Sequence, residues 1–347
     1  MCQYSSTDGF PNDWHFVHLG SRAVGGAGLI MVEATAVSAE GRITPDDNGI
    51  WSDEHIAHYK RITDFMKQHG SVAGVQLAHA GRKASTSAPW LGGEGLAAGD
   101  KRAWTVVAPS AVAFKNTYPT PRAMSVDDIY KVVSDFVAAA KRSLAAGFQV
   151  IEIHAAHGYL MHQFLSPLSN VRTDEFGGSL ENRMRFPLMA VKAVRAVWPV
   201  DLPLFVRISS TDWAAGPEEL EMVGTKKTPS EKGWNISEAV IFCEELKKLG
   251  VDFIDCSTGG ILADAKIPNG PNYQVPFAEF IRKNVDIMTG AVGLITTAVQ
   301  AESILHAQSA DAIFMAREML RDPYFPARAA KELKFTMDDR PKQYGRA

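Results

Sequence analysis

Short apolar runs alternate with longer amphipathic stretches along most of this chain. The runs contain four to seven residues and are rich in Val, Ile, Leu and Phe, which is typical of strands buried on both faces of a parallel sheet. They predict seven strands, at 29–34, 72–78, 150–155, 204–209, 253–257, 287–290 and 312–316.

The clearest helix is predicted to begin at Ser125. The Ser125 hydroxyl can cap the first turn, and Asp128 follows three residues later, as in a capping box. Apolar residues then recur at helical spacing until Gly147 ends the helix, and they are Ile129, Val132, Val133, Phe136, Val137, Ala140 and Leu144.

Repeated alternation of strands and helices without a Pro- or Ser-rich linker favours one α/β domain over residues 1–347. Its length suits a TIM (β/α)8 barrel with loops inserted after the third barrel strand, at about 81–122, and after the fifth, at about 212–234. An open, doubly wound sheet is the alternative. The eighth strand, which is the first of the barrel, would have to come from the N-terminus, where only MCQY precedes polar sequence. The first barrel strand is therefore predicted to be truncated.

Composition and charge narrow the function classes. The 347 residues are 46% hydrophobic and 22% charged, as in an ordinary globular protein. The net charge of -3 and the absence of a dense Lys/Arg run argue against nucleic-acid and membrane partners. The three cysteines are widely spaced, without CxxC, so neither a disulfide framework nor a cysteine-only metal site is predicted. With no signal sequence and no apolar run of about 18 residues, a cytoplasmic protein is expected.

The strand predicted at 150–155 ends in two histidines and a tyrosine, in the sequence IEIHAAHGY. They could form part of a metal site, bind a carbonyl or an anion, or simply be satisfied by hydrogen bonds in a packed loop. The other strand ends offer Gln76 and Arg207 rather than carboxylates, which disfavours zinc and suits an electron-accepting heterocycle with a polar substrate. The loops that begin TGAVG and AREML follow the last two strands, where barrels commonly bind a phosphate.

Four stretches of the chain resemble the Old Yellow Enzyme family, in its thermophilic-like (class II) branch. They are MCQYSS, VQLAHAGRKAS, MLRDPYFPARAAK and the long stretch IEIHAAHGYLMHQFLSPLSNVRTDEFGGSLENR. The resemblance extends from Met1 to the tail PKQYGRA. It implies a barrel that binds FMN and an NAD(P)H-dependent ene-reductase, in which hydride passes through flavin N5 to the β-carbon of enones, maleimides or nitroalkenes. NADPH is the expected reductant and NADH the alternative.

The resemblance also implies a role for individual residues. His154 and His157 would hydrogen-bond the activating oxygen of the substrate, and Tyr159 would donate a proton to its α-carbon. Tyr4 would contact the substrate, as would Arg346 reaching into a neighbouring subunit of a homodimer or homotetramer. The residues implied to bind FMN are Cys2, Ala34, Gln76, Arg207, Gly293, Ala316 and Arg317.

Three departures from the family pattern are evident. Ala316 replaces the usual Gly before the phosphate-side arginine, which could displace a backbone N–H. Met1 coincides with an internal family position, so a chain that began there would expose unpaired backbone groups at one seam of the barrel and bind FMN weakly. The segment AAGPEELEMVGTKKTPSEKGWN is longer than usual and is predicted to be a solvated loop.

Two other functional readings remain open at this point. An inactive or unstable truncated barrel of the same family is one of them. A flavin oxidoreductase related to dienoyl-CoA reductase is a weaker one, because this chain lacks the iron-sulfur cysteine cluster and the C-terminal nucleotide-binding domain of such enzymes.

Overall fold

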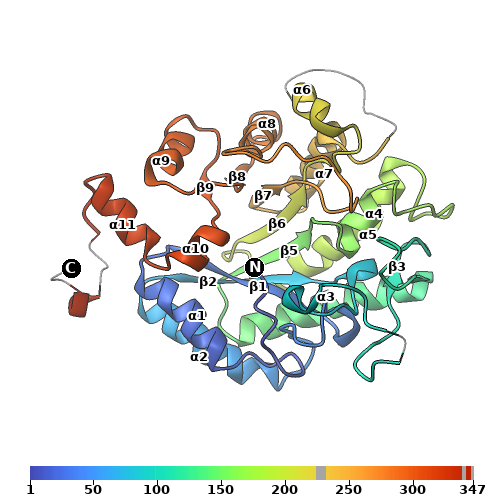
Figure 1. The fold of residues 1–347 in the computed structure, drawn as a ribbon, viewed down its shortest axis with the longest axis horizontal. Coiled ribbons are helices and arrows are strands. Elements are labelled where there is room, and N and C mark those ends of the chain that lie inside the picture. The colour runs from blue at the N-terminus through green and yellow to red at the C-terminus, as the bar shows by residue number, and fades with distance from the viewer. Residues whose placement is uncertain (98, 224–231, 338–340, 345–347) are drawn as a thin grey trace.

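A computed structural model of the chain describes residues 1–97, 99–223, 232–337 and 341–344. Its centre is a curled sheet whose strands are all parallel (Figure 1). In spatial order the strands are β1 (Leu29–Ala36), β2 (Val72–Ala78), β5 (Val150–Ala155), β6 (Leu204–Ser209), β7 (Phe253–Ser257), β8 (Met288–Ala291) and β9 (Ala312–Ile313). All seven predicted strands are confirmed, although the last ends three residues earlier than predicted.

Helices cover the outer face of the sheet, and contacts between neighbouring helices run from α1 round to α8 (Figure 1). The α-helices are α1 (Asp13–Val24), α2 (His55–Gln68), α3 (Val126–Ala145), α4 (Leu160–Leu165), α5 (Leu180–Arg195), α6 (Glu219–Met222), α7 (Ile236–Lys248), α8 (Val275–Val285), α9 (Ala298–His306), α10 (Arg317–Arg321) and α11 (Phe325–Glu332). The capping box predicted for α3 is present: Ser125 Oγ accepts from the Asp128 N–H at 3.1 Å, and Asp128 Oδ2 accepts from the Ser125 N–H at 2.7 Å.

The sheet separates an apolar layer from a polar one. Every residue of β5 and β7 is buried. Because side chains alternate along a strand, Ile151 and Ile153 lie on one face, within the hydrophobic core, and Glu152 and His154 lie on the other. The core therefore occupies the space between sheet and helices, and the polar residues face the interior of the curled sheet.

The sheet does not close in the part of the chain that the structure describes. β1 and β9 stand at its two ends and each pairs with one neighbour only. An apolar hollow of about 440 Å³ lies between them, with walls from both strands, α1 and α10. This agrees with the expectation of seven strands rather than eight.

No helix within the described ranges is long and apolar enough to cross a membrane.

Both predicted insertions contain short ordered elements. The segment after β2 includes the 3-10 turns Gly81–Lys83 and Pro89–Leu91 and the strand pair β3 (Val107–Ala108) and β4 (Arg122–Ala123). Other 3-10 turns lie at Ala39–Gly41, Gly216–Glu218 and Lys342–Tyr344. The segment after β6 is less solvated than predicted: Glu219, Trp234 and Asn235 are buried, and Asn235 caps α7. Residues 224–231 of this segment lie outside the described part.

Candidate active site

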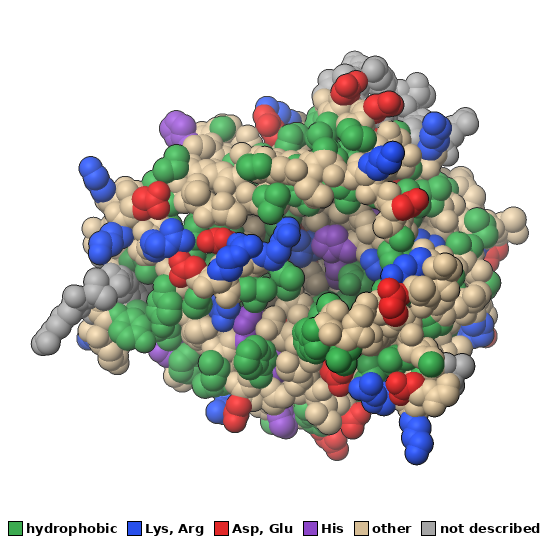
Figure 2. All heavy atoms as spheres, in the orientation of Figure 1, with side chains coloured by type: hydrophobic (Ala, Val, Ile, Leu, Met, Phe, Trp, Pro, Cys, Tyr) green, Lys and Arg blue, Asp and Glu red, His purple; other side chains and the backbone are tan. Residues whose placement is uncertain are grey.

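A cavity of about 370 Å³ opens at the carboxyl ends of the strands. Histidine side chains are visible at the bottom of a hollow in the centre of this face (Figure 2). Nine of the residues predicted from the sequence line the cavity together, and they are Cys2, Tyr4, Ala34, Gln76, His154, His157, Tyr159, Arg207 and Ala316. The structure thus brings together side chains from the N-terminal segment, four strands and the loop before α10.

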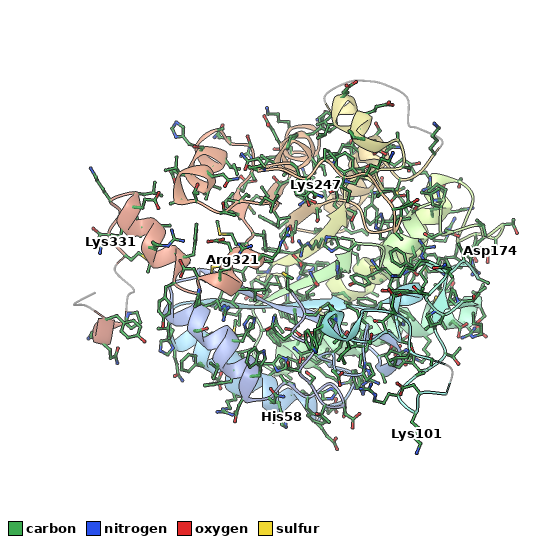
Figure 3. The ribbon with its side chains drawn as sticks, in the orientation of Figure 1. His58, Lys101, Asp174, Lys247, Arg321 and Lys331 are labelled. Carbon is green, nitrogen blue, oxygen red and sulfur yellow. The ribbon has the colours of Figure 1, made fainter. Side chains whose placement is uncertain are left out.

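A second cavity of about 180 Å³ adjoins the first. The loops that follow β8 and β9 form most of its wall, which includes Gly293 and Arg317, and it shares Arg207 and Ala316 with the larger cavity. Arg321 on α10 also lies in this wall, and Figure 3 shows the position of its side chain. The two predicted groups of cofactor-binding residues therefore occupy two adjoining cavities.

The rings of His154 and His157 are steeply inclined to one another in the wall of the larger cavity. Their ring centroids are 5.2 Å apart and their planes make an angle of 78°. Burial, followed by the positive charge of Arg207, lowers the pKa of both imidazoles well below the ordinary value of 6.5. Both rings are consequently neutral at neutral pH, and each can donate one hydrogen bond.

Tyr159 lies beside this pair. Its ring centroid is 5.1 Å from that of His154, and the Lys83 ammonium lies 5.2 Å from the centre of the phenol ring. Burial, followed by the neighbouring Cys2, raises the pKa of Tyr159 well above 10, so the phenol keeps its proton across the working pH range. Lys83 itself was not predicted as a site residue. Burial lowers the pKa of its ammonium group to about 8.

A buried network fixes the loop that carries His157, Gly158 and Tyr159. The Gly158 N–H donates to His162 Nδ1 at 2.9 Å. The opposite nitrogen of that ring lies 2.9 Å from Asp212 Oδ1, close enough for an ion pair but without hydrogen-bond geometry. Ser166 Oγ donates to the same carboxylate at 2.5 Å. Because the backbone itself is bonded to this network, the direction in which the loop presents its side chains is fixed.

Gly158 is predicted to tolerate no side chain. Its φ is +71°, and a Cβ there would lie 2.0 Å from the carbonyl oxygen of Gly260. Gly178 has a similar φ of +80° but nothing within 4 Å of its Cβ position. Gly178→Ala should therefore cost about 1–2 kcal/mol of unfolding free energy for the backbone strain alone. Gly158→Ala should cost clearly more in urea unfolding, and equal losses in the two variants would show that the approach of the two loops is not tight.

A polar layer crosses the bottom of the larger cavity. Gln76 Nε2 donates to Glu152 Oε1 at 2.7 Å, and Arg207 Nε lies 3.0 Å from Asp255 Oδ2 without pointing at it as a hydrogen bond. The two carboxylates were not predicted, although each is a charged residue in an otherwise apolar strand. Burial, followed by the proximity of Asp255, raises the pKa of Glu152 from 4.5 to about 8, and burial also raises that of Asp255. At neutral pH the pair therefore holds a proton.

Stability should decrease with rising pH because of Glu152. The folded protein keeps this proton up to about pH 8, whereas the unfolded chain releases it near the ordinary value of 4.5. Between these values folding takes up a proton, so the free energy of unfolding falls as the pH rises. In urea unfolding across this pH range, Glu152→Gln should show a shallower slope than the wild type. The exposed Glu244→Gln on α7 should leave the slope unchanged, and an unchanged slope in Glu152→Gln would contradict the assignment.

The N-terminal segment forms one wall of the larger cavity. The Gln3 N–H donates to Glu33 Oε1 at 2.8 Å, at the point where an irregularity in the pairing of β1 exposes that carboxylate to the cavity. Burial raises the pKa of the Cys2 thiol and of the Tyr4 phenol above their ordinary values, so both stay protonated. Glu33 was not predicted either. Its pKa is raised to about 7, chiefly by burial.

The two cavities fit the chemistry of the predicted FMN. Polar atoms without a hydrogen-bond partner in the described part of the chain remain on His154, Glu152 and Asp255, around the larger cavity. At the smaller one, Arg317 is exposed and makes no ion pair with any described residue, which suits a phosphate. Ala316 has a φ of −104°, on the negative side that residues other than glycine adopt, so its φ does not require glycine.

Gly293 lies in the wall of the smaller cavity at a position where a side chain would be crowded. Its φ is +131°, and a Cβ there would lie 3.0 Å from both Gln274 Nε2 and Tyr273 Cε1.

Of the predicted site residues, only Arg346 is not placed, because it lies outside the described residues. Its contact with a neighbouring subunit stays a prediction.

Comparison with known proteins finds matches that cover nearly the whole chain. A family model described as "NADH:flavin oxidoreductase / NADH oxidase family" matches residues 1–335. An NADPH dehydrogenase of Bacillus velezensis is 48% identical over 349 aligned residues, which cover 100% of this chain and 93% of that protein. The NADPH dehydrogenase of Bacillus subtilis is also 48% identical, with 100% and 92% covered.

Solved structures show the same architecture. Morphinone reductase in complex with tetrahydroNAD has a TM-score of 0.75 and 27% identity, covering 99% of this chain and 87% of that one. An Old Yellow Enzyme homologue from Zymomonas mobilis has a TM-score of 0.73 and 26% identity, covering 96% and 87%. A 2-naphthoyl-CoA reductase complex reaches a TM-score of 0.82 at 24% identity, but this chain covers only 49% of it, and the likeness is one of fold.

Proposed function

This chain belongs to the NADH:flavin oxidoreductase / NADH oxidase family, and on that premise we propose that it is an FMN-dependent ene-reductase. The reductant would be NADPH, with NADH as the alternative, and the acceptors would be alkenes activated by a carbonyl or nitro group, such as enones, maleimides and nitroalkenes. One observation carries the proposal: two neutral histidines and a protonated tyrosine line one cavity together with Gln76 and Arg207.

The residues that would hold FMN divide between the two cavities. Gln76 and Arg207 would face the polar edge of the ring, with Ala34 and Cys2 beside it. Arg317 and the loops at Gly293 and Ala316 would bind the phosphate. FMN, when bound, supplies the two-electron chemistry that links oxidation of a nicotinamide to reduction of an alkene.

His154 and His157 would bind the activating oxygen of the alkene. Negative charge grows on that oxygen when hydride reaches the β-carbon, and two preorganised N–H donors in a buried site stabilise this charge. Neutral rings suit the role, because a neutral imidazole donates one hydrogen bond without bringing a buried positive charge close to Arg207.

Tyr159 would complete the reduction. Once hydride has added to the β-carbon, the α-carbon needs a proton, and the phenol of Tyr159 is the protonated group next to the histidine pair. The phenolate left behind would regain its proton from water. Tyr4, on the N-terminal wall of the same cavity, would contact the rest of the substrate.

The proposal is tested by isolating the protein with its cofactor. A yellow protein with a flavin absorption spectrum, NADPH oxidation that depends on added 2-cyclohexen-1-one, and uptake of one solvent deuterium at the α-carbon in D2O are the expected results. A protein that oxidises NADPH with oxygen but leaves enones, N-phenylmaleimide and nitroalkenes unreduced would overturn it. A homodimer or homotetramer, with Arg346 contributing across the interface, is proposed as the assembly.

A further inference from the structure

The backbone of His157 is held in one conformation by two hydrogen bonds. Its φ is +57°, an uncommon value for a residue other than Gly. Its N–H donates to Ser209 Oγ at 2.9 Å, and its carbonyl oxygen accepts from Lys83 Nζ at 3.0 Å. The same ammonium donates to the Gly260 carbonyl at 3.2 Å, which joins the loops after β5 and β7. The backbone of His157 is therefore fixed. The open question is which nitrogen of its ring carries the proton.

The ring has one partner in the described part of the chain. Its Nε2 lies 2.7 Å from Ser257 Oγ, at the end of β7, whereas its Nδ1 makes no hydrogen bond to the described residues. This contact has two readings. Either the imidazole donates from Nε2 to the hydroxyl, or the hydroxyl donates to Nε2. The two readings place the single proton of the neutral ring on opposite nitrogens.

The surroundings of Ser257 decide between the two readings. Its hydroxyl hydrogen could go to Gln274 Oε1 at 3.2 Å or to His157 Nε2 at 2.7 Å. Hydroxyl hydrogen bonds to oxygen span roughly 2.5–3.0 Å, so the contact with Gln274 is long and the contact with His157 is favourable. Gln274 is also satisfied without Ser257, because its Oε1 accepts from Thr258 Oγ1 at 2.7 Å and its Nε2 donates to the Val292 carbonyl at 2.9 Å.

We propose that Ser257 is a positioning residue that sets the tautomer of His157. Its hydroxyl donates to Nε2, and the ring proton is thereby kept on Nδ1, the nitrogen left to donate to the oxygen of the substrate. The imidazole is neutral in this buried site, so it has only one proton to place. The positioning role of Ser257 in catalysis rests on the proposed function. The assignment of the ring proton to His157 Nδ1 does not.

The tautomer can be measured directly by nitrogen NMR. In protein labelled with ¹⁵N-histidine and loaded with FMN, without substrate, the His157 signals should show a protonated Nδ1 and an unprotonated Nε2. His157→Gln identifies these signals by their loss. In Ser257→Ala the preference should disappear, with Nε2 protonated in a substantial part of the molecules. Ser257→Thr, which keeps a hydroxyl, should retain the wild-type pattern.

The chain offers a matched control. Ser210 is a buried serine after β6 whose hydroxyl has no partner among the described residues, so Ser210→Ala should leave the His157 nitrogen signals unchanged. In kinetics, Ser257→Ala should lose on the order of 10-fold to 100-fold in kcat/KM for 2-cyclohexen-1-one, part of what loss of a whole oxyanion donor costs.

The outcomes separate the two proposals. A wild-type ring with its proton on Nε2, or an Nδ1–H pattern that survives in Ser257→Ala, would overturn the role of Ser257. Absence of alkene reduction by the wild-type protein would overturn the proposed function instead, because the nitrogen spectra are recorded without an alkene. Should Ser257→Ala fail to fold, loss of the Nδ1–H pattern in Ser257→Cys, a weaker donor of similar size, supports the assignment and its full retention contradicts it.

Discussion

Replacing His154 and His157 together by alanine should slow alkene reduction by a factor of about 10³ or more. Loss of a single preorganised donor to a developing oxyanion typically costs about 10²–10³ in rate, and the double variant removes both donors. The measurement is the rate at which photochemically reduced enzyme is reoxidised by 2-cyclohexen-1-one under anaerobic conditions. Reoxidation at the wild-type rate would rule out the histidine pair as the binding site for the substrate oxygen.

A histidine control keeps this result interpretable. His306 is exposed in the last turn of α9, and His306→Ala should reoxidise at the wild-type rate. The flavin content and the urea midpoint of the double variant should be recorded with the kinetics. Retained flavin with slow reoxidation assigns the loss to the chemistry, whereas lost flavin would show that the two rings also support the cofactor site.

Replacing Arg207 by methionine should both destabilise the protein and empty it of flavin. Asp255 Oδ2 lies 3.0 Å from Arg207 Nε and is buried, so the variant leaves an uncompensated carboxylate. Breaking a buried pair in this way typically costs about 3–5 kcal/mol of unfolding free energy. Arg61→Met breaks an exposed pair of 2.7 Å with Asp13 and should cost no more than about 1 kcal/mol.

A second substitution separates the two effects of Arg207. Arg207→Met/Asp255→Asn removes both charges, so most of the lost stability should return. If Arg207 also contacts the cofactor, flavin occupancy should stay low in this double variant, as read from the absorbance ratio after desalting. Recovery of full occupancy together with stability would show that Arg207 acts only as a counter-ion for Asp255.

Much of the fold could be predicted because its strands are buried on both faces. Such strands appear in the sequence as uninterrupted apolar runs, and each of the seven runs forms a strand. The Old Yellow Enzyme resemblance is confirmed by the family match and by the solved neighbours. The run at 312–316 is shorter as a strand, because the pairing of β9 with β8 covers only Ala312 and Ile313.

The sequence located cavity residues best near the carboxyl ends of strands. His154 and Arg207 lie close to the ends of β5 and β6, and His157 and Tyr159 follow β5. Parallel strands bring these ends to one edge. Glu33, Glu152 and Asp255 were missed because they lie within apolar runs, where a charged residue gives no periodic signal. Lys83 was missed because its partner Gly260 is 177 residues away, a contact that no local pattern encodes.

The solvated loop predicted after β6 is confirmed only in part of the residues that the structure describes, where Pro217, Glu218 and Glu221 are exposed. Its polar composition is real, but Glu219 and Asn235 are buried and accept hydrogen bonds from nearby backbone N–H groups. Composition measures how many polar groups a segment contains. It does not reveal whether those groups find partners inside the protein.

The polar layer beneath the cavity also constrains how the chain can assemble. Gln76 stands opposite Glu152, and Arg207 stands opposite both His154 and Asp255 in the pairing of adjacent strands. A slip of one residue between two of these strands would turn a charged side chain from the cavity toward the apolar helix layer, where it would have no partner. Apolar side chains alone would disfavour a slip of one residue but would not prevent it. The polar layer, which includes the proposed cofactor contacts Gln76 and Arg207, therefore also favours the correct strand alignment while the protein folds.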